Sequence, residues 1–365
     1  MQIVFAILAA FIITFILLPI IIKVSRSIDL LDTPDRRKIH SISTPSLGGI
    51  GIFIGFILSV LVIIPVAQLV EIKYFLFGLL IMLMLGVRDD VSSLTAKHKL
   101  AIQIFSALMV VYFSDIRLHG FYGIFGIENM PEWFNIPFSI FVIVALTNSF
   151  NLIDGIDGLA ASTGILILGF FGWAFLAEGQ IAFAVVSISV VGALFAFLFF
   201  NWYPSKIFMG DTGSLVLGFI VSSLAIKFIN VGDGADFVLP IDSSVGVCVA
   251  ALILPIFDTL RVFFIRFRNG KNPLDPDRNH LHHGLLKLGM NHAQATTTLL
   301  VFNTSILTIS LCLNSFLDNG SLLVVTFLIV IVSTMYFEYR LKNVKFFKKE
   351  VKVDATPDLY ISKSA

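Results

Sequence analysis

The chain has 365 residues, of which 57% are hydrophobic and only 13% are charged, and its mean hydropathy is +0.94. A soluble globular protein has about a quarter of its residues charged, so this composition excludes a soluble domain, a disordered chain and a disulfide scaffold. The formal net charge of +1 indicates neither a nucleic-acid partner nor an acidic one. The sequence therefore predicts an all-α integral membrane protein.

Eleven apolar segments are candidate membrane helices, since a bilayer crossing needs about 20 apolar residues, or fewer where the helix is broken. They cover residues 1–24, 48–70, 74–87, 100–113, 137–153, 159–177, 181–200, 213–229, 244–265, 296–316 and 321–337. The first segment has no basic residue ahead of it and no small-residue cleavage site. It is predicted to be a retained helix, not a signal peptide.

The positions of the charges predict the orientation. All but three of the 25 Lys and Arg residues lie in or beside the loops after the odd-numbered spans, or in the tail; the exceptions are Lys73, Arg117 and Lys227. The other connections carry an acidic set, namely Glu71, Asp115, Glu128, Glu132, Glu178, Asp233, Asp236, Asp242 and Asp318. The positive-inside rule then places the N-terminus outside, on the periplasmic side, and the C-terminus in the cytoplasm. We expect one membrane domain over 1–337 and a basic cytoplasmic tail over 338–365.

The first predicted cytoplasmic loop, 25–47, is basic and leads into Gly48 and Gly49 at the start of the second span. Glycines at a helix start allow an anion to approach the backbone N–H groups. An ordinary basic membrane anchor explains the Arg and Lys residues of this loop, but not the glycines. Both interpretations are open at this point.

The second predicted cytoplasmic loop begins with the adjacent carboxylates Asp89 and Asp90 at the end of the third span. Two such groups repel each other and are costly to desolvate, so they indicate a compensating cation, a proton-acceptor role or contact with water. An ordinary interfacial acid pair is the alternative. Lys97 and Lys99 follow and supply positive charge suited to a phosphate.

The segment after the fifth span repeats an amide or a carboxylate every three residues. These residues are Asn148, Asn151, Asp154 and Asp157. Because an α-helix turns through about 100° per residue, one straight helix would not aim all four at one ligand. Gly155 and Gly158 are predicted to end the helix and fold its last turn around that ligand. Amide and carboxylate oxygens suit Mg²⁺ or Mn²⁺ better than zinc.

The fourth predicted cytoplasmic loop, 201–212, contains Asn201, Phe208 and Asp211 in an apolar and glycine-rich context. Asp211 is a candidate functional carboxylate, but an Asp before a helix can also cap the helix by accepting backbone N–H bonds. Phe208 can face lipid or stack on a base. The sequence alone does not choose between these interpretations.

The fifth predicted cytoplasmic loop, 266–295, contains a cluster of phosphate and sugar donors. Its members are Arg278, His280, His282 and His283. Zinc binding is a competing interpretation of the His residues, with Asp277 as a further zinc ligand. In the preceding helix, Asp258 and Arg261 have the i to i+3 spacing of a helix-surface ion pair.

The unusual polar motifs are confined to the predicted cytoplasmic face of the membrane. They lie in loops 25–47, 88–99, 154–158, 201–212 and 266–295. A transporter would also place ionisable residues near the midplane and open to the other side. We therefore expect an enzyme at the cytoplasmic surface with a divalent ion, an anionic soluble substrate and a lipid co-substrate, and phosphoryl transfer is the chemistry that combines them.

These motifs, in this order, resemble those of the polyprenyl-phosphate N-acetylhexosamine-1-phosphate transferases, with a resemblance that extends from the first span to about His283. The resemblance implies a magnesium-dependent phosphoglycosyl transferase of the bacterial cytoplasmic (inner) membrane. Its substrates would be a UDP-N-acetylhexosamine and undecaprenyl phosphate, with UMP released. Membrane lipids surround it, no nucleic acid is involved, and a homodimer is left open. A phospho-MurNAc-pentapeptide translocase and a non-catalytic or transport protein are the alternatives.

The resemblance also implies roles for single residues. Asp211 is similar to the magnesium ligand and Asn151 lies beside that ion, with Mn²⁺ as an alternative metal. Asp89, the candidate base, and Asp90 look like the acid pair near the lipid phosphate. The implied catalytic set is Asp89, Asp90, Asp154, Asp157 and His280.

The implied substrate contacts form a larger group. Asp157 and Phe208 match the positions that hold uracil by hydrogen bonding and by stacking. The matches around the diphosphate and sugar are Lys99, Arg278, His280, His282 and His283, and further pocket positions are Gly48, Gly49, Asn148, Asn201 and Asp154.

Two departures from relatives are visible. Ser92 and Ser93 stand where some relatives have a third acid, so no third carboxylate is given a base or metal role. The His-Leu-His-His order of 280–283 resembles the UDP-N-acetylglucosamine branch, whereas the translocases have three consecutive His residues. This points away from peptidoglycan lipid I synthesis and towards initiation of O-antigen, common-antigen, teichoic-acid or capsule synthesis.

Overall fold

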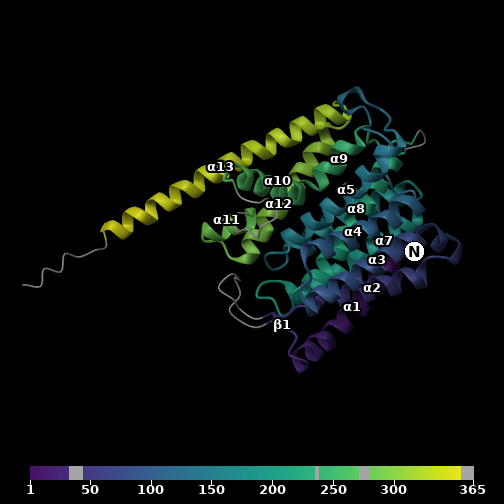
Figure 1. Ribbon diagram of the computed structural model, residues 1–365, viewed down its shortest axis with the longest axis horizontal. Coiled ribbons are helices and arrows are strands. Elements are labelled where there is room, and N and C mark those ends of the chain that lie inside the picture. Colours follow the sequence, from purple (N-terminus) through teal and green to yellow (C-terminus); the bar gives the residue numbers. More distant parts are fainter. Residues whose placement is uncertain (33–43, 235–237, 271–279, 355–365) are drawn as a thin grey trace, which may run out of the picture.

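The computed structural model describes residues 1–32, 44–234, 238–270 and 280–354, with only the backbone of 344–354. Figure 1 shows a bundle of long helices. The elements are α1 (Gln2–Ser27), β1 (Leu31–Asp32), β2 (Thr44–Pro45), α2 (Gly48–Ile63), α3 (Val66–Val91), α4 (Ala96–Phe113), η1 (Ile124–Gly126), α5 (Glu132–Ile153), α6 (Leu159–Ala177), α7 (Ile181–Asn201), α8 (Gly210–Gly232), α9 (Ser244–Ala251), α10 (Ile253–Arg268), α11 (Leu281–Lys287), α12 (His292–Leu313) and α13 (Asn319–Asp354). Strands β1 and β2 pair antiparallel.

Within the described residues, eight helices are long and apolar enough to cross a membrane: α1, α3, α5, α6, α7, α8, α12 and α13. The bent pair α9 and α10 forms a ninth crossing if the two helices are one broken span. This confirms a multi-pass helical membrane protein. Each of the eleven predicted segments coincides with a helix or with the bent pair, but α2 has only 16 residues and α4 begins with charged side chains. The number of crossings and the orientation stay predictions.

A predicted span boundary is wrong because of proline. The predicted span 48–70 is two helices, since α2 ends at Ile63 and α3 begins at Val66. Pro65 has no N–H to donate and favours the extended conformation that Ile64 adopts, with φ −78° and ψ 125°. Helix α13 continues past 337 to Asp354, and the division into a membrane domain and a tail stays a prediction.

The predicted span 244–265 is broken at Leu252, where α9 and α10 meet at 73°. Pro255 cannot donate to the carbonyl of Ala251 four residues earlier, which leaves a backbone acceptor free inside the bundle. The side chain of Asn303 on α12 donates to this carbonyl at 3.1 Å. The bend is therefore stabilised by a hydrogen bond from a neighbouring helix, as membrane proteins require of interrupted helices.

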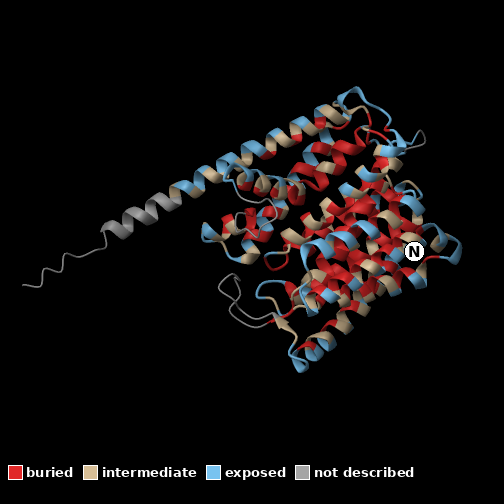
Figure 2. Cartoon of the chain, viewed as in Figure 1, coloured by how far each residue is buried: buried red, intermediate tan, exposed pale blue. Residues whose placement is uncertain are grey.

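Helix α8 is the centre of the bundle and contacts α2, α3, α5, α6 and α9. Figure 2 shows buried residues concentrated there, whereas α1 and α13 have exposed outer faces. Large apolar side chains occupy these outer faces, among them Ile12 and Ile16 on α1 and Val332 and Met335 on α13. A lipid environment suits such surfaces, because it does not penalise apolar exposure.

Strands β1 and β2 and the connections after α5 and α7 gather at the end of the bundle opposite the N-terminus (Figure 1). Hydrogen bonds join these loops: the N–H of Phe208 donates to Pro45, and the hydroxyl of Ser205 donates to Asp157. Loops predicted to share one face of the membrane thus share one end of the structure.

The bond from Asn303 yields a first prediction. Replacing Asn303 with Leu leaves the Ala251 carbonyl without its side-chain donor, and we expect a loss of about 1–3 kcal/mol in the free energy of unfolding. Thermal unfolding in detergent measures this as a lower midpoint. The matched control is Thr304→Ala on the exposed side of α12, whose hydroxyl bonds only within its own helix. Equal midpoints for Asn303→Leu and the control would contradict the interpretation of the bend.

Candidate active site

The site is built around the first turn of α8, which lies against two other helices. A Cβ at Gly49 on α2 would overlap the backbone of Gly213, and a Cβ at Gly86 on α3 would overlap that of Thr212. The two glycines let three helix backbones approach more closely than any side chain would allow, as small residues do in membrane bundles. The direction and depth of α8 are fixed by this contact.

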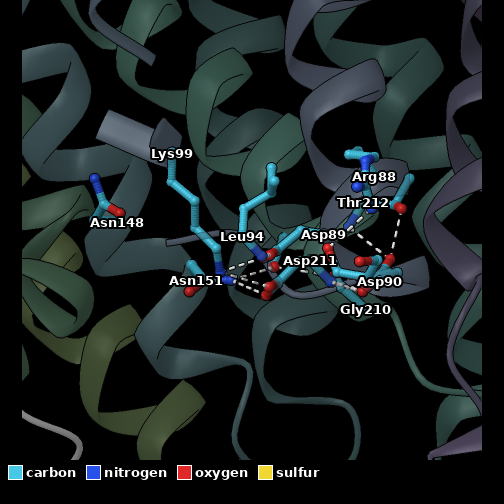
Figure 3. A network of polar contacts seen from close by, with 12 residues as sticks. Arg88, Asp89, Asp90, Leu94, Lys99, Asn148, Asn151, Gly210, Asp211 and Thr212 are labelled. Carbon is cyan, nitrogen blue, oxygen red and sulfur yellow. Dashed lines mark hydrogen bonds and ion pairs between the residues drawn. The ribbon is translucent and has the colours of Figure 1, made fainter. Parts of the chain in front are cut away.

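Asp90 on α3 caps α8 from outside the helix. Its carboxylate accepts the N–H of Asp211 at 2.8 Å and the N–H of Thr212 at 2.9 Å, as well as the Thr212 hydroxyl (Figure 3). These bonds satisfy donors that the start of a helix leaves free, and a carboxylate there also complements the helix dipole. Asp211 itself makes no capping bond, so the capping interpretation of Asp211 is wrong. Asp90 is the cap.

Asp89 and Asp211 are held by the same cation. The ammonium of Lys99 on α4 forms an ion pair with Asp89 and lies 3.2 Å from an oxygen of Asp211. The side chain of Asp89 is only 2% exposed, and its other oxygen accepts the N–H of Leu94 at 2.7 Å. The side chains of Lys99 and Asp211 are 30% and 34% exposed, so this part of the cluster opens to the surroundings. The structure brings these predicted residues together.

The predicted metal pair is also adjacent. The amide nitrogen of Asn151 on α5 donates to Asp211 at 2.7 Å and to Ser214 at 2.8 Å. Asn148, one turn earlier, lies apart from this network (Figure 3). It exchanges amide hydrogen bonds with Gln103 on α4, at 2.6 and 3.3 Å. Its amide joins α4 to α5, and a substrate contact by Asn148 stays a prediction.

The turn 154–158 connects the metal pair to the other loops. Helix α5 ends at Ile153, and Gly158, with φ of +77°, is the N-cap residue of α6, so the helix ends in the predicted segment. Burial raises the pKa of the Asp154 carboxyl well above its ordinary value, and the nearby carboxylates of Asp211, Asp90 and Asp157 raise it further. Both effects favour the protonated form of Asp154.

Three predicted substrate contacts make structural hydrogen bonds. The N–H groups of Gly48 and Gly49 donate to the carbonyls of Phe208 and Met209, at 3.0 and 2.9 Å, so they are not free for an anion. A Cβ at Gly48 would overlap the ring of Phe197, which is a packing constraint. The buried amide of Asn201 accepts the N–H of Gly158 at 2.9 Å and donates to the carbonyl of Ile207 at 2.8 Å. Protein groups already occupy these polar atoms, and substrate contacts by Gly48, Gly49 and Asn201 stay predictions.

Asp157 joins the turn to two other elements. Its carboxylate accepts the hydroxyl of Ser205 at 3.0 Å and lies 3.3 Å from Nδ1 of His292 on α12, and its carbonyl accepts the hydroxyl of Thr296. The side chain is 8% exposed. Phe208 is half-buried in the same loop, so uracil binding by Asp157 and Phe208 stays a prediction.

The His residues form a compact group. Nδ1 of His280 lies 2.8 Å from Asp258 on α10, and its ring stacks on His282, with centroids 5.5 Å apart. The ring of His283 lies 4.3 Å from that of His282. Arg278, also predicted here, lies outside the described residues. Asp258 does not pair with Arg261, so the predicted surface ion pair is wrong; Arg261 pairs instead with Glu338 at 2.8 Å.

His282 cannot supply positive charge to a substrate at neutral pH. Burial lowers its pKa to about 3, although the nearby Asp258 carboxylate opposes this shift. A Cβ at Gly155 would overlap the His282 ring, so the turn after α5 packs directly on the imidazole. His282 is a neutral ring that joins the His group to the carboxylate group.

The structure leaves both metal predictions open. In the described part of the chain, no three His, Cys, Asp or Glu side chains are grouped to hold a metal ion, which applies to the His residues and to the carboxylates alike. Mg²⁺ keeps several waters and takes one or two carboxylates together with substrate phosphates, so it does not require a group of three. The partly exposed carboxylate of Asp211 and the amide of Asn151 are chemically compatible with Mg²⁺ of this kind.

Fold and site together define a class: a polytopic membrane protein with a carboxylate, amide and lysine cluster suited to phosphate chemistry. The family model described as "Glycosyl transferase family 4" matches residues 72–229 of the chain. It is 32% identical over 349 residues to a probable undecaprenyl-phosphate N-acetylglucosaminyl 1-phosphate transferase of Bacillus subtilis, with 94% of each chain covered.

Two further relatives have similar names. A decaprenyl-phosphate N-acetylglucosaminephosphotransferase of Mycolicibacterium smegmatis is 29% identical over 82% of this chain and 79% of its own. An undecaprenyl-phosphate alpha-N-acetylglucosaminyl 1-phosphate transferase of Escherichia coli K12 is 27% identical over 75% of this chain and 73% of its own. The chain belongs to glycosyl transferase family 4.

The sequence interpretation missed several residues that hold the site. They are Asp258, Ser205, Thr212, His292 and Thr296. The role of Asp258 could have been predicted from the sequence, because a carboxylate within an apolar helix needs a polar partner. The others are ordinary loop or helix residues whose partners are distant in sequence.

The cap yields a second prediction. We expect Asp90→Ala to lose about 1–3 kcal/mol in the free energy of unfolding, because it leaves buried N–H groups at the start of α8 unsatisfied. Thermal unfolding of the purified protein without substrate measures this. Asp233→Ala, at the opposite end of α8, is the control and should unfold like the wild type. Equal unfolding midpoints for Asp90→Ala and Asp233→Ala would contradict this prediction.

Proposed function

We propose that this protein transfers N-acetylglucosamine 1-phosphate from UDP-N-acetylglucosamine to undecaprenyl phosphate and releases UMP. The observation that supports this proposal most directly is that Asp211, Asn151, Asp89 and Lys99 lie in contact at one end of the bundle. The names of the three relatives support the acceptor class and the sugar. The His-Leu-His-His order supports UDP-N-acetylglucosamine over a MurNAc-pentapeptide donor.

The proposed reaction is a direct displacement. An oxygen of the lipid phosphate bonds to the sugar-linked phosphorus of the UDP-sugar, while the bond from that phosphorus to the bridging oxygen breaks and its electron pair leaves with UMP. Bound Mg²⁺ would neutralise charge on the diphosphate. The residues that would hold it are Asp211 and Asn151. A covalent phospho-aspartate intermediate is the alternative route.

The chain's own residues would act mainly by position and charge. Lys99 can contact a phosphate oxygen when it leaves one of its two carboxylates, because an ammonium is a mobile point charge on a flexible stem. Asp89 would orient the lipid phosphate or accept its proton. Positioning and electrostatic stabilisation supply most of the acceleration in phosphoryl transfer.

The proposal extends to placement in the membrane. Eleven crossings, with the N-terminus outside and the C-terminus inside, would put the clustered loops in the cytoplasm of a bacterial cell, where UDP-sugars are available. The product would then serve as the first lipid-linked intermediate of an O-antigen, common-antigen, teichoic-acid or capsule polysaccharide. The confinement of most basic residues to one set of connections supports this orientation.

Asp211→Asn tests the proposal. The substitution removes the charge of the proposed metal ligand but keeps an oxygen that can accept from Asn151, so we expect kcat to fall by about 1,000-fold with the fold intact. The assay measures radiolabelled lipid product from UDP-N-acetylglucosamine and undecaprenyl phosphate, with Mg²⁺ or with EDTA.

Asp318→Asn is the matched control, because this exposed acid lies at the start of α13, far from the cluster. It should retain wild-type rates. Wild-type turnover by Asp211→Asn would exclude the metal assignment. Folded wild-type protein that makes no lipid-linked product from any UDP-N-acetylhexosamine would exclude the function.

A further inference from the structure

We infer that Asp258 is a positioning residue for the transfer reaction, which acts by fixing the imidazole of His280 toward the phosphates of the sugar donor. The inference rests on the proposed function and adds a residue to it. Asp258 lies on α10, 22 residues before its partner in the sequence.

The carboxylate of Asp258 has two partners on the segment that carries the His residues. One oxygen lies 2.8 Å from Nδ1 of His280, and the other accepts the N–H of Leu281 at 2.8 Å. The side chains of Asp258 and His280 are 2% and 5% exposed. A buried carboxylate is costly unless it is paired and hydrogen-bonded, and these two bonds meet that requirement.

Helix α10 makes a second charged contact, which does not involve Asp258. Arg261 lies one turn after Asp258 but pairs with Glu338 on α13 at 2.8 Å. Asp258 and Arg261 therefore serve different elements: Arg261 joins α10 to α13, and Asp258 holds the segment with the His residues. The bond to Leu281 also fixes the backbone directly after His280.

The contact determines which ring nitrogen is available. A carboxylate only accepts, so the proton of His280 lies on Nδ1 and Nε2 is the nitrogen left for a ligand. The ring is also stacked on His282 with an interplanar angle of 8°, and His282 packs against Gly155. Tilt and rotation of the imidazole are both restricted, as catalytic positioning requires.

The segment with the His residues meets the turn after α5 through His282, which packs on Gly155 and stacks on His280. Helix α10 contacts α5, the helix that carries Asn151, and the bend of 73° at Leu252 gives α10 a direction different from that of α9. The Asp258 carboxylate holds the Nδ1 side of the ring and leaves Nε2 as the atom that would meet the donor. When Nε2 carries a proton, it would donate to a phosphate oxygen, and Asp258 would keep that N–H in place.

A double-mutant cycle tests the inference. Asp258→Asn, His280→Ala and the double variant are assayed for lipid product from UDP-N-acetylglucosamine, with enzyme concentration raised for the slow variants. We expect Asp258→Asn alone to lower kcat by about 100-fold, the scale of one well-placed acid–base or positioning group. In the His280→Ala background the same substitution should change kcat by less than about twofold, because Asp258 then has no imidazole to hold.

A merely structural role would give a different result. An Asp258→Asn effect of equal size in both backgrounds, or a loss that follows the thermal midpoint, would overturn the inference. Glu338→Gln is the matched control, since it makes the same acid-to-amide change in the ion pair between Arg261 of α10 and α13, and it should keep wild-type kcat. If Asp258→Asn does not fold, Asp258→Glu replaces it in the same cycle, with the same expected non-additivity. Inactive wild type would instead contradict the proposed function.

Discussion

The structure depends on the close approach of three backbones at the start of α8. Gly49 and Gly86 leave no space between α8 and its neighbours, and the carboxylate of Asp90 satisfies the N–H groups that this burial would otherwise leave unpaired. The two features depend on each other. Without the glycines, α3 would lie too far from α8 for the Asp90 carboxylate to reach its N–H groups. Without that carboxylate, the buried N–H groups at the start of α8 would have no hydrogen-bond partner. Asp211 is one residue into this helix, so its position follows from the same contact.

A second constraint is the turn 154–158, which joins two groups of side chains. One side of this turn belongs to the carboxylate cluster, through Asn151 and Asp154, and the other packs on His282. Asp157 extends the connection to Ser205 and to α12. A displacement of this turn would therefore move the proposed metal and phosphate contacts together.

The charge distribution explains why phosphate chemistry suits the site. Asp154 experiences the negative charges of Asp211, Asp90 and Asp157, while Lys99 neutralises part of the charge of Asp89 and Asp211. A divalent cation would remove the remaining imbalance and would itself attract two phosphorylated substrates. The excess of carboxylates therefore fits a metal-bridged anion better than a bare anion.

The sequence by itself determined the membrane class, the approximate position of every long helix and the residues Asp89, Lys99, Asn151 and Asp211, because apolar length and isolated polar groups are local signals. Only the tertiary structure decided which polar atoms remain available. Gly48, Gly49, Asn148 and Asn201 look like ligand contacts in sequence, but each is occupied by a partner from another helix or loop. Asp90 and Asp258 are likewise explained only by partners that lie far away in the chain. Hydrogen-bond partners and backbone approach are properties of the packed bundle, and no residue pattern along one chain specifies them.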